Sequence, residues 1–156
     1  MKKQEITSTR IFIELEDRPL FVNLRDRIKK DLPRNTKFDT MMMFNLALLV
    51  GRNILHEKQK IIRSEGVVRE NAPTSDNKII LHCTAISDTG DVELAYDEED
   101  GVVGANTLRI CEQYAKAGLH ELDKWMNDKN IDFYERLTQE LLKKDEENGI
   151  TRQSMD

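Results

Sequence analysis

The residue types that most often carry catalysis are few in this 156-residue chain, and their spacing does not suit it. Neither the histidines nor the cysteines show the short spacings that are typical of zinc ligands. The adjacent pair His82 and Cys83 could bind a metal only if a distant residue joined it. Cys111 and His120 fall about 180° apart on a helical wheel, which argues against a nucleophile–base pair. We expect the cysteines to be buried free thiols. The full set is His56, His82, His120, Cys83 and Cys111.

Sequence motifs of phosphate and nuclease chemistry are also missing. The chain has no glycine-rich phosphate loop and no nucleophile elbow. Asp76 and Lys78 have the acid-x-Lys spacing found in metal-dependent nucleases, but they precede an apolar segment. The acidic run 97–100 lacks the alternating ligands of a calcium loop and predicts a solvated loop. We therefore expect no catalytic residue, no metal and no cofactor.

Charge is divided along the chain. Residues 1–63 hold fourteen Lys or Arg against eight Asp or Glu, a net charge of +6, whereas residues 64–156 have a net charge of −11. A basic segment of this kind is typical of surfaces that bind phosphates. Two interpretations stay open: contact with DNA or RNA, or a helix that solvates the protein or docks on its own acidic half. The candidate nucleic-acid-binding residues are Arg18, Arg25, Arg27, Lys29, Lys30, Arg34 and Lys37.

Two helices are predicted in the first third of the chain. The first covers residues 19–32, because proline is tolerated in a first turn and Pro33 cannot continue the helix. The second begins at Thr36 or Asp39 and ends at a Gly51 C-cap. It is apolar on almost every side, so we expect it to be the central buried helix.

A strand is predicted before these helices, over residues 9–15, where Ile11, Ile13 and Leu15 alternate with other residues. The order strand, helix, helix resembles the ribbon-helix-helix family of DNA-binding repressors and antitoxins, in which paired strands of a dimer enter the major groove. The outward residues would then be Arg10, Phe12 and Glu14, and Glu14 would oppose phosphate. A dimeric regulator of this kind is the second interpretation, and a homodimer built on the strand stays open.

The middle of the chain is less regular. Residues 53–77 predict a surface connection, because they lack periodicity and include glycine and proline. The segment 78–86 suits a helix or a strand, and we favour the helix. A short helical piece is predicted over residues 92–96.

The clearest pattern is an amphipathic helix that begins at Asn106 or Thr107. Gly118 lies within its apolar stripe, where it costs about 1 kcal/mol relative to Ala. We therefore expect Gly118 to let another helix approach closely. A last helix is predicted over residues 132–144. The apolar stripe comprises Leu108, Cys111, Tyr114, Ala115, Gly118, Leu119, Leu122, Trp125 and Met126, opposite Arg109, Gln113, Lys116, His120 and Lys124.

An ordered set of short motifs over residues 36–126 resembles the small proteins associated with the Dnd DNA-phosphorothioation system. The motifs are a Gly and a basic residue after an apolar helix, then Thr-Gly-Asp, then E-x-Y-A-x-x-G-L. The resemblance implies a bacterial module that replaces a phosphate oxygen of DNA with sulfur, or that restricts unmarked DNA. It implies no catalytic residues. The matching positions are Gly51, Arg52, Thr89, Gly90, Asp91, Glu112, Tyr114, Ala115, Gly118 and Leu119.

Together these features predict a mainly α protein with one compact helical domain over residues 1–146, in which 1–8 are flexible, and a polar tail over 147–156. No apolar run approaches the roughly 18 residues of a membrane span, and residues 1–10 lack the apolar core of a signal peptide. We expect a cytoplasmic, non-catalytic accessory or scaffold protein of a phosphorothioation-linked defence system. Its partners would be protein components of a DNA modification or restriction complex, with direct contact to DNA left open.

Overall fold

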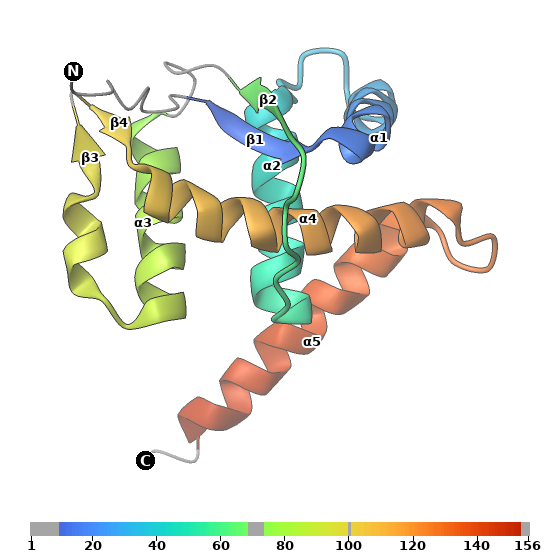
Figure 1. The fold of residues 1–156 in the computed structure, drawn as a ribbon. Helices are drawn as coiled ribbons and strands as arrows, with labels where there is room; N and C mark the ends of the chain where they lie inside the picture. The colour runs from blue at the N-terminus through green and yellow to red at the C-terminus, as the bar shows by residue number, and fades with distance from the viewer. Residues whose placement is uncertain (1–9, 69–73, 100, 154–156) are drawn as a thin grey trace.

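The computed structural model describes residues 10–68, 74–99 and 101–153, and within these ranges the protein is mainly α, as predicted. The long helix α4 crosses the middle of the molecule, and the other elements lie along it (Figure 1). The elements are β1 (Ile11–Glu14), η1 (Leu15–Asp17), α1 (Arg18–Asp31), α2 (Thr40–Leu49), η2 (Val50–Leu55), β2 (Ser64–Val68), α3 (Ser75–Thr89), η3 (Val92–Tyr96), β3 (Glu98–Glu99), β4 (Val102–Val103), α4 (Ala105–Asn127) and α5 (Phe133–Gln153).

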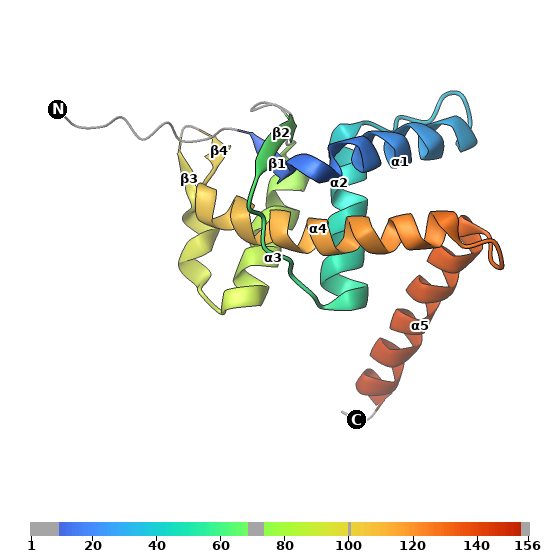
Figure 2. The same cartoon turned by 45° about the vertical axis from the view of Figure 1, so that its right-hand side comes forward.

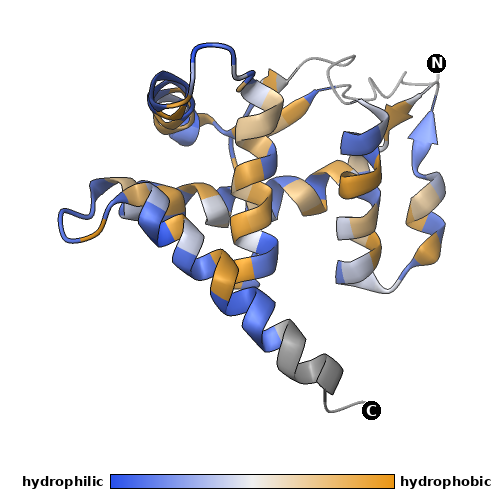
Figure 3. Ribbon diagram, turned by 180° about the vertical axis from the view of Figure 1, so that it is seen from behind, coloured by the Kyte–Doolittle hydropathy of each residue, from blue (hydrophilic) through white to orange (hydrophobic). Residues whose placement is uncertain are grey.

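The helix α2 lies behind α4 and is the central buried helix that its sequence predicts. It begins at Asp39, whose side chain accepts a hydrogen bond from Met42 N at 3.0 Å. Viewed from behind, α2 is apolar along most of its length (Figure 3). Its buried residues are Met41, Met43, Phe44, Ala47 and Leu48.

Two glycines allow α4 to cross α2 and η2 at close range. A Cβ atom on Gly118 would lie 1.8 Å from Ala47 O, and one on Gly51 would lie 1.9 Å from Tyr114 O. The predicted role of Gly118 is therefore confirmed. The predicted C-cap at Gly51 is wrong, because the chain continues through the π-helical turn of η2, and His56 adopts the left-handed conformation after it (φ 54°). Gly51 serves the close approach of the two backbones instead.

A two-stranded antiparallel sheet, formed by β1 and β2, lies over the first half of α4. The strand β1 matches the prediction. The strand β2 falls inside residues 53–77, which were predicted to be a surface connection, so that prediction is wrong over Ser64–Val68. The strands pair antiparallel, with Phe12 opposite Gly66 and Glu14 opposite Ser64. The sequence of β2 carries little periodicity of its own, and the pairing with β1 makes it a strand.

The favoured helix over 78–86 is confirmed as part of α3, which is capped by Thr74 at its start and ends at Gly90 with φ 72°. The short helical piece over 92–96 is confirmed as η3. Cys83 lies on the exposed side of α3, so the prediction that it is buried is wrong, whereas Cys111 is buried.

The acidic run after η3 is not simply a solvated loop. Glu98 and Glu99 pair with Val103 and Val102 in a small hairpin, and Asp100 lies outside the described residues. Asp97 Oδ2 accepts a hydrogen bond from Thr107 N at 2.9 Å, so Asp97 caps α4 from ten residues away. The predicted cap at Asn106 or Thr107 is wrong, because α4 begins at Ala105 and Gly104 occupies the N-cap position.

The last helix, α5, begins near the predicted position and extends nine residues beyond Lys144, to Gln153. The predicted polar tail is therefore helical over 147–153, and residues 1–8 and 154–156 lie outside the described residues. The helix projects away from the end of α4 (Figures 1 and 2). Within the described residues, no helix is long and apolar enough to cross a membrane.

Candidate functional site

The seven candidate nucleic-acid-binding residues lie on α1 and on the turn that follows it. The helix buries Phe21, Leu24 and Ile28 against the body of the protein. It leaves the rest of its surface toward solvent at one edge of the molecule (Figure 2).

Three of the seven cations have partners within the protein. Arg18 forms an ion pair with Glu65 of β2. Arg25 donates hydrogen bonds to Asp26 at 2.9 Å and to Thr40 at 3.0 Å. The third, Lys37, lies 3.6 Å from Asp39, the residue that caps α2. These three cations help to hold α1 and its turn in place.

The other four cations lie at the C-terminal end of α1, and we refer to them as the α1 cation group. All four are exposed, and none forms a hydrogen bond or ion pair within the described residues. The acids of α1 have other partners, because Asp26 accepts from Arg25 and Asp31 accepts from Tyr134 Oη at 3.0 Å. The group therefore keeps its positive charge available to a ligand. Its members are Arg27, Lys29, Lys30 and Arg34.

The two flanks of α1 that a helical wheel separates have different neighbours. Arg27 and Lys30 line a cavity of about 600 Å³ between α1 and the end of α4, where Asp123 is also found. Arg18 and Arg25, on the other flank, contact β2 and the start of α2. The predicted basic residues thus surround the helix and do not form one continuous face.

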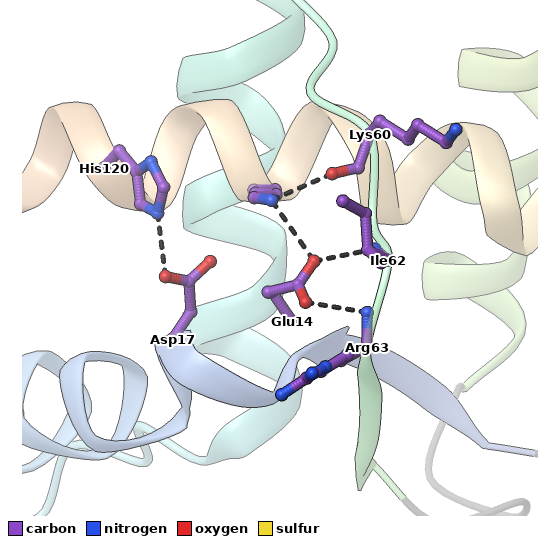
Figure 4. A network of polar contacts seen from close by, with 7 residues as sticks. Glu14, Asp17, Lys60, Ile62, Arg63 and His120 are labelled. Carbon is purple, nitrogen blue, oxygen red and sulfur yellow. Dashed lines mark hydrogen bonds and ion pairs between the residues drawn. The ribbon is translucent and has the colours of Figure 1, made fainter.

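A second group of charged residues joins β1 and η1 to α4, and we refer to it as the β1–α4 seam (Figure 4). Glu14 is 7% exposed and accepts hydrogen bonds from Ile62 N at 2.8 Å and Arg63 N at 2.7 Å. Lys116 Nζ lies 3.2 Å from Glu14 and donates to Lys60 O at 2.8 Å. The seam consists of Glu14, Asp17, Glu112, Lys116 and His120.

The three seam residues on α4, which are Glu112, Lys116 and His120, are spaced four residues apart. Glu112 accepts a hydrogen bond from Phe12 N at 3.1 Å, and His120 Nε2 lies 2.8 Å from Asp17 Oδ1. The three α4 residues therefore meet the strand segment in order, each through one polar contact. Lys116 and His120 are half-buried here, although the helical wheel places them toward solvent.

The surroundings of the seam shift the pKa values of two carboxyl groups in opposite directions. The backbone N–H groups of Ile62 and Arg63, followed by Lys116, lower the pKa of Glu14. Burial raises the pKa of Glu112 to about 7, although the Phe12 N–H and Arg109 oppose this. The expectation that Glu14 faces outward with Arg10 and Phe12 is wrong, since Glu14 is buried and Leu15 is 46% exposed in its place.

The residues that carry the family resemblance come together where α4 crosses η2. Tyr114 Oη donates a hydrogen bond to Asp88 of α3, which also accepts from Lys58 at 2.8 Å. Arg52 lies over the Tyr114 ring at 5.6 Å and donates to Ser87. Burial would raise the pKa of Asp88, but the contacts with Lys58 and Tyr114 outweigh it and the pKa is lowered. Burial and Asp88 raise the pKa of Tyr114 to about 12.

The other resemblance residues form contacts within a turn or lie in the core. Thr89 Oγ1 donates to Ala85 O at 2.9 Å and accepts from Asp91 N at 3.1 Å, around the turn at Gly90. Asp91 caps η3 by accepting from Glu93 N at 3.0 Å. Ala115 and Leu119 are buried in the core. The motif positions therefore fix turns and helix crossings.

The residues considered for catalysis are separated in the structure. His82 lies between Leu94 O, at 2.8 Å, and Glu98 Oε1, at 2.9 Å. Cys111 Sγ donates to Leu81 O, and burial raises the pKa of this thiol. Lys78, from the nuclease-like pair, donates to Gly101 O. Over the described ranges, no three His, Cys, Asp or Glu residues are grouped so that they could hold a metal ion.

Comparisons with protein-family models, with curated proteins and with solved structures find no match to this chain. Sequence reasoning missed Glu14, Asp88 and Asp97, whose partners lie at least ten residues away. No periodic pattern could have identified those contacts.

Proposed function

We propose that this chain is a non-catalytic accessory or scaffold protein of a bacterial DNA phosphorothioation-linked modification or restriction system, and that the α1 cation group contacts DNA. The observation that carries the DNA contact is the set of four exposed cations without an ion-pair partner in the described residues. Because the other charged clusters described above are paired internally, this group has the most charge to offer a polyanion.

The geometry of the group suits contact with the DNA backbone. Lys and Arg that neutralise phosphates release condensed counterions, and this favours binding whatever the base sequence. The group spans the last turns of α1 and the turn that follows, and its members lie on more than one side of the helix. It therefore offers exposed charge to phosphates and not one helix face that could read bases. Binding that is independent of sequence and sensitive to salt is the expected behaviour.

The scaffold part of the proposal is supported by the family resemblance and by the roles of the motif residues. Gly51, Tyr114 and Gly118 lie at the helix crossing, so these motif residues support the packing of the fold. A fixed fold with charged, exposed side chains suits assembly with protein components of a DNA modification complex in the cytoplasm.

The ribbon-helix-helix interpretation has less support. The strand β1 already pairs with β2 of the same chain, and Phe12 N on β1 donates to Glu112. A strand that is paired in this way is poorly placed to form the intermolecular ribbon of that family.

The test is binding to a fluorescently labelled duplex, followed by anisotropy at increasing salt. The triple variant Lys29→Gln, Lys30→Gln, Arg34→Gln should weaken binding about tenfold or more at low salt. It should also reduce the slope of log K against log salt by about 3. The matched control removes three cations elsewhere: Lys124→Gln, Lys129→Gln, Lys143→Gln. An equal loss in the control, or no binding by the native protein, would overturn the DNA contact.

The biological context needs a separate experiment. Affinity purification of the tagged chain from its host should recover components of a DNA modification or restriction system. Recovery of none of them would contradict the proposed link to phosphorothioation. The proposed DNA contact would then depend only on the binding measurement.

A further inference from the structure

A cavity of about 470 Å³ lies between the β1–β2 sheet and the first turns of α4, away from the α1 cation group. Three cations line it, from three different segments: Arg10 before β1, Lys60 from the η2–β2 connection, and Arg109 from α4. All three are exposed, and none forms an ion pair within the described residues. The cavity therefore collects three cations that form no ion pair in the described part of the chain.

The acid in this cavity offsets the positive charge only in part. Glu112 lines the wall, and one of its oxygens accepts from Phe12 N. Its pKa of about 7 leaves it partly protonated near neutral pH. Three cations against one incompletely charged carboxyl give the cavity a net attraction for an anion.

Backbone contacts fix the segment that carries Lys60 next to α4. Lys60 O accepts from Lys116 at 2.8 Å and Gln59 N donates to Gln113 O at 3.0 Å, so the connection is fixed to α4 (Figure 4). A Cβ atom on Gly66 would lie 2.9 Å from Arg10 Cδ and 3.6 Å from Phe12 Cε1. Glycine at this position therefore leaves the space that Arg10 and Phe12 occupy beside the cavity.

The other walls differ from those of a site for a bare anion. The aromatic ring of Phe12 and the apolar side chains of Ile61 and Leu108 line the cavity, together with the hydrogen-bonding groups of Ser64 and Gln113. The volume falls within the range of sites for small organic ligands. An aromatic wall gives a flat ring a stacking partner, and neutral polar groups can bond to its edge.

We propose that this cavity binds a nucleoside monophosphate, with the phosphate among Arg10, Lys60 and Arg109 and the base against Phe12. The nucleotide can be free in solution or stand at the phosphorylated end of a single strand, because both present the same chemistry. Arginine suits the phosphate, since its planar group donates two parallel hydrogen bonds. The inference does not depend on the DNA contact of α1.

Calorimetric titration with adenosine 5′-monophosphate tests the site, with adenosine and inorganic phosphate as separate probes. We expect the monophosphate to bind at least about tenfold more tightly than either probe, because only it occupies both halves of the cavity. Arg109→Gln should weaken this binding about tenfold. The control Lys124→Gln removes a cation from the same helix outside the cavity and should leave binding unchanged. A 5′-phosphorylated oligonucleotide that binds more tightly than the mononucleotide would place the strand end as the ligand.

Three results would overturn the proposal. One is no heat of binding with the monophosphate at millimolar concentration. Another is equal affinity for inorganic phosphate and the monophosphate, which would exclude the base from the cavity. The third is an equal loss of binding in Arg109→Gln and in the Lys29, Lys30, Arg34 triple variant, which would place the nucleotide elsewhere. Arg109 is exposed and its side chain forms no hydrogen bond or ion pair in the described residues, so Arg109→Gln should leave the fold intact.

Discussion

The β1–α4 seam and the α1 cation group both contain charged side chains, but the charges of the two groups have different surroundings. In the seam, Glu14, Lys116 and His120 each have a partner within 3.2 Å. In the α1 cation group, Lys29, Lys30 and Arg34 have none within the described residues. The number of charges in a segment therefore says little about its function. Charges that have partners within the protein stabilise the fold, whereas charges without partners can bind a ligand.

The difference follows from burial. A strand segment laid over the polar flank of α4 removes carboxylates from water, and a buried charge is tolerated only when it is paired or hydrogen-bonded. The end of α1 lies at the margin of the molecule, where water solvates each cation and no partner is needed. Removal of charge should consequently lower the stability of the protein in the seam and leave it almost unchanged in the α1 cation group.

The largest effect is expected at the crossing on which both regions depend. Gly118→Val would place side-chain atoms against Ala47 O and force α4 away from α2, at a cost of roughly 3 kcal/mol or more in the free energy of unfolding. Chemical denaturation measures this loss. The control Ala95→Val, on the exposed surface of η3, should change stability by no more than about 0.5 kcal/mol. A Gly118→Val protein as stable as the control would contradict the close crossing.

A clear loss of stability is also expected when the seam is broken at Glu14. Glu14→Gln removes the carboxylate that accepts from two backbone N–H groups and faces Lys116. The double variant Glu14→Gln, Lys116→Met should recover part of the loss, because it no longer leaves a half-buried cation unpaired. Thermal unfolding measures the stability of these variants, and the exposed variant Glu16→Gln is the control.

The same residue gives the seam a dependence on acid. The pKa of Glu14 is lowered below its ordinary value of 4.5, so its contribution to stability is complete above about pH 4.5 and is lost as the pH falls through the lower value. The gap in stability between the native protein and Glu14→Gln should therefore narrow below pH 4.5. A gap that stayed constant down to pH 2 would show that the carboxylate charge is not what stabilises the seam.

The contribution of Glu112 to stability should depend on pH in the opposite direction to that of Glu14, and the change in stability should be smaller. Its pKa is raised from 4.5 to about 7, so the folded protein binds more protons than the unfolded chain between these values, and stability falls as the pH rises through this window. Glu112→Gln removes the titration and should be stabilised relative to the native protein by roughly 1 to 3 kcal/mol on going from pH 5 to pH 8. Denaturant titrations at both pH values test this. No relative change would contradict the raised pKa.

The smallest effect on stability is expected in the α1 cation group. Removing Lys29, Lys30 and Arg34 together should change the free energy of unfolding by no more than about 0.5 kcal/mol, because these cations have no partners to lose. The DNA-binding variant described above can be used for this denaturation measurement. A loss as large as that of Glu14→Gln would mean that the group serves the fold, and the contrast between the two regions would fail.

The sequence predicted the elements whose cause is local. The apolar stripe of α4 is buried from Leu108 to Trp125, because a helix that repeats apolar residues on one side must cover that side. The start of α2 at Asp39 was one of two predicted caps, since a carboxylate needs only the next turn to act as one. The position of Gly118 in the stripe was enough to predict a close helix crossing.

The tertiary structure alone decided which distant residues meet. The strand β2 depends on the edge that β1 offers, the cap of α4 depends on Asp97 reaching across the β3–β4 hairpin, and Glu14 is buried because η1 turns Leu15 outward. The charge of the α1 segment was plain in the sequence, but the division between its paired and unpaired cations was not. Periodicity and capping act over one or two turns of chain, whereas pairing of charges is a property of neighbours in space, and only the fold brings those neighbours together.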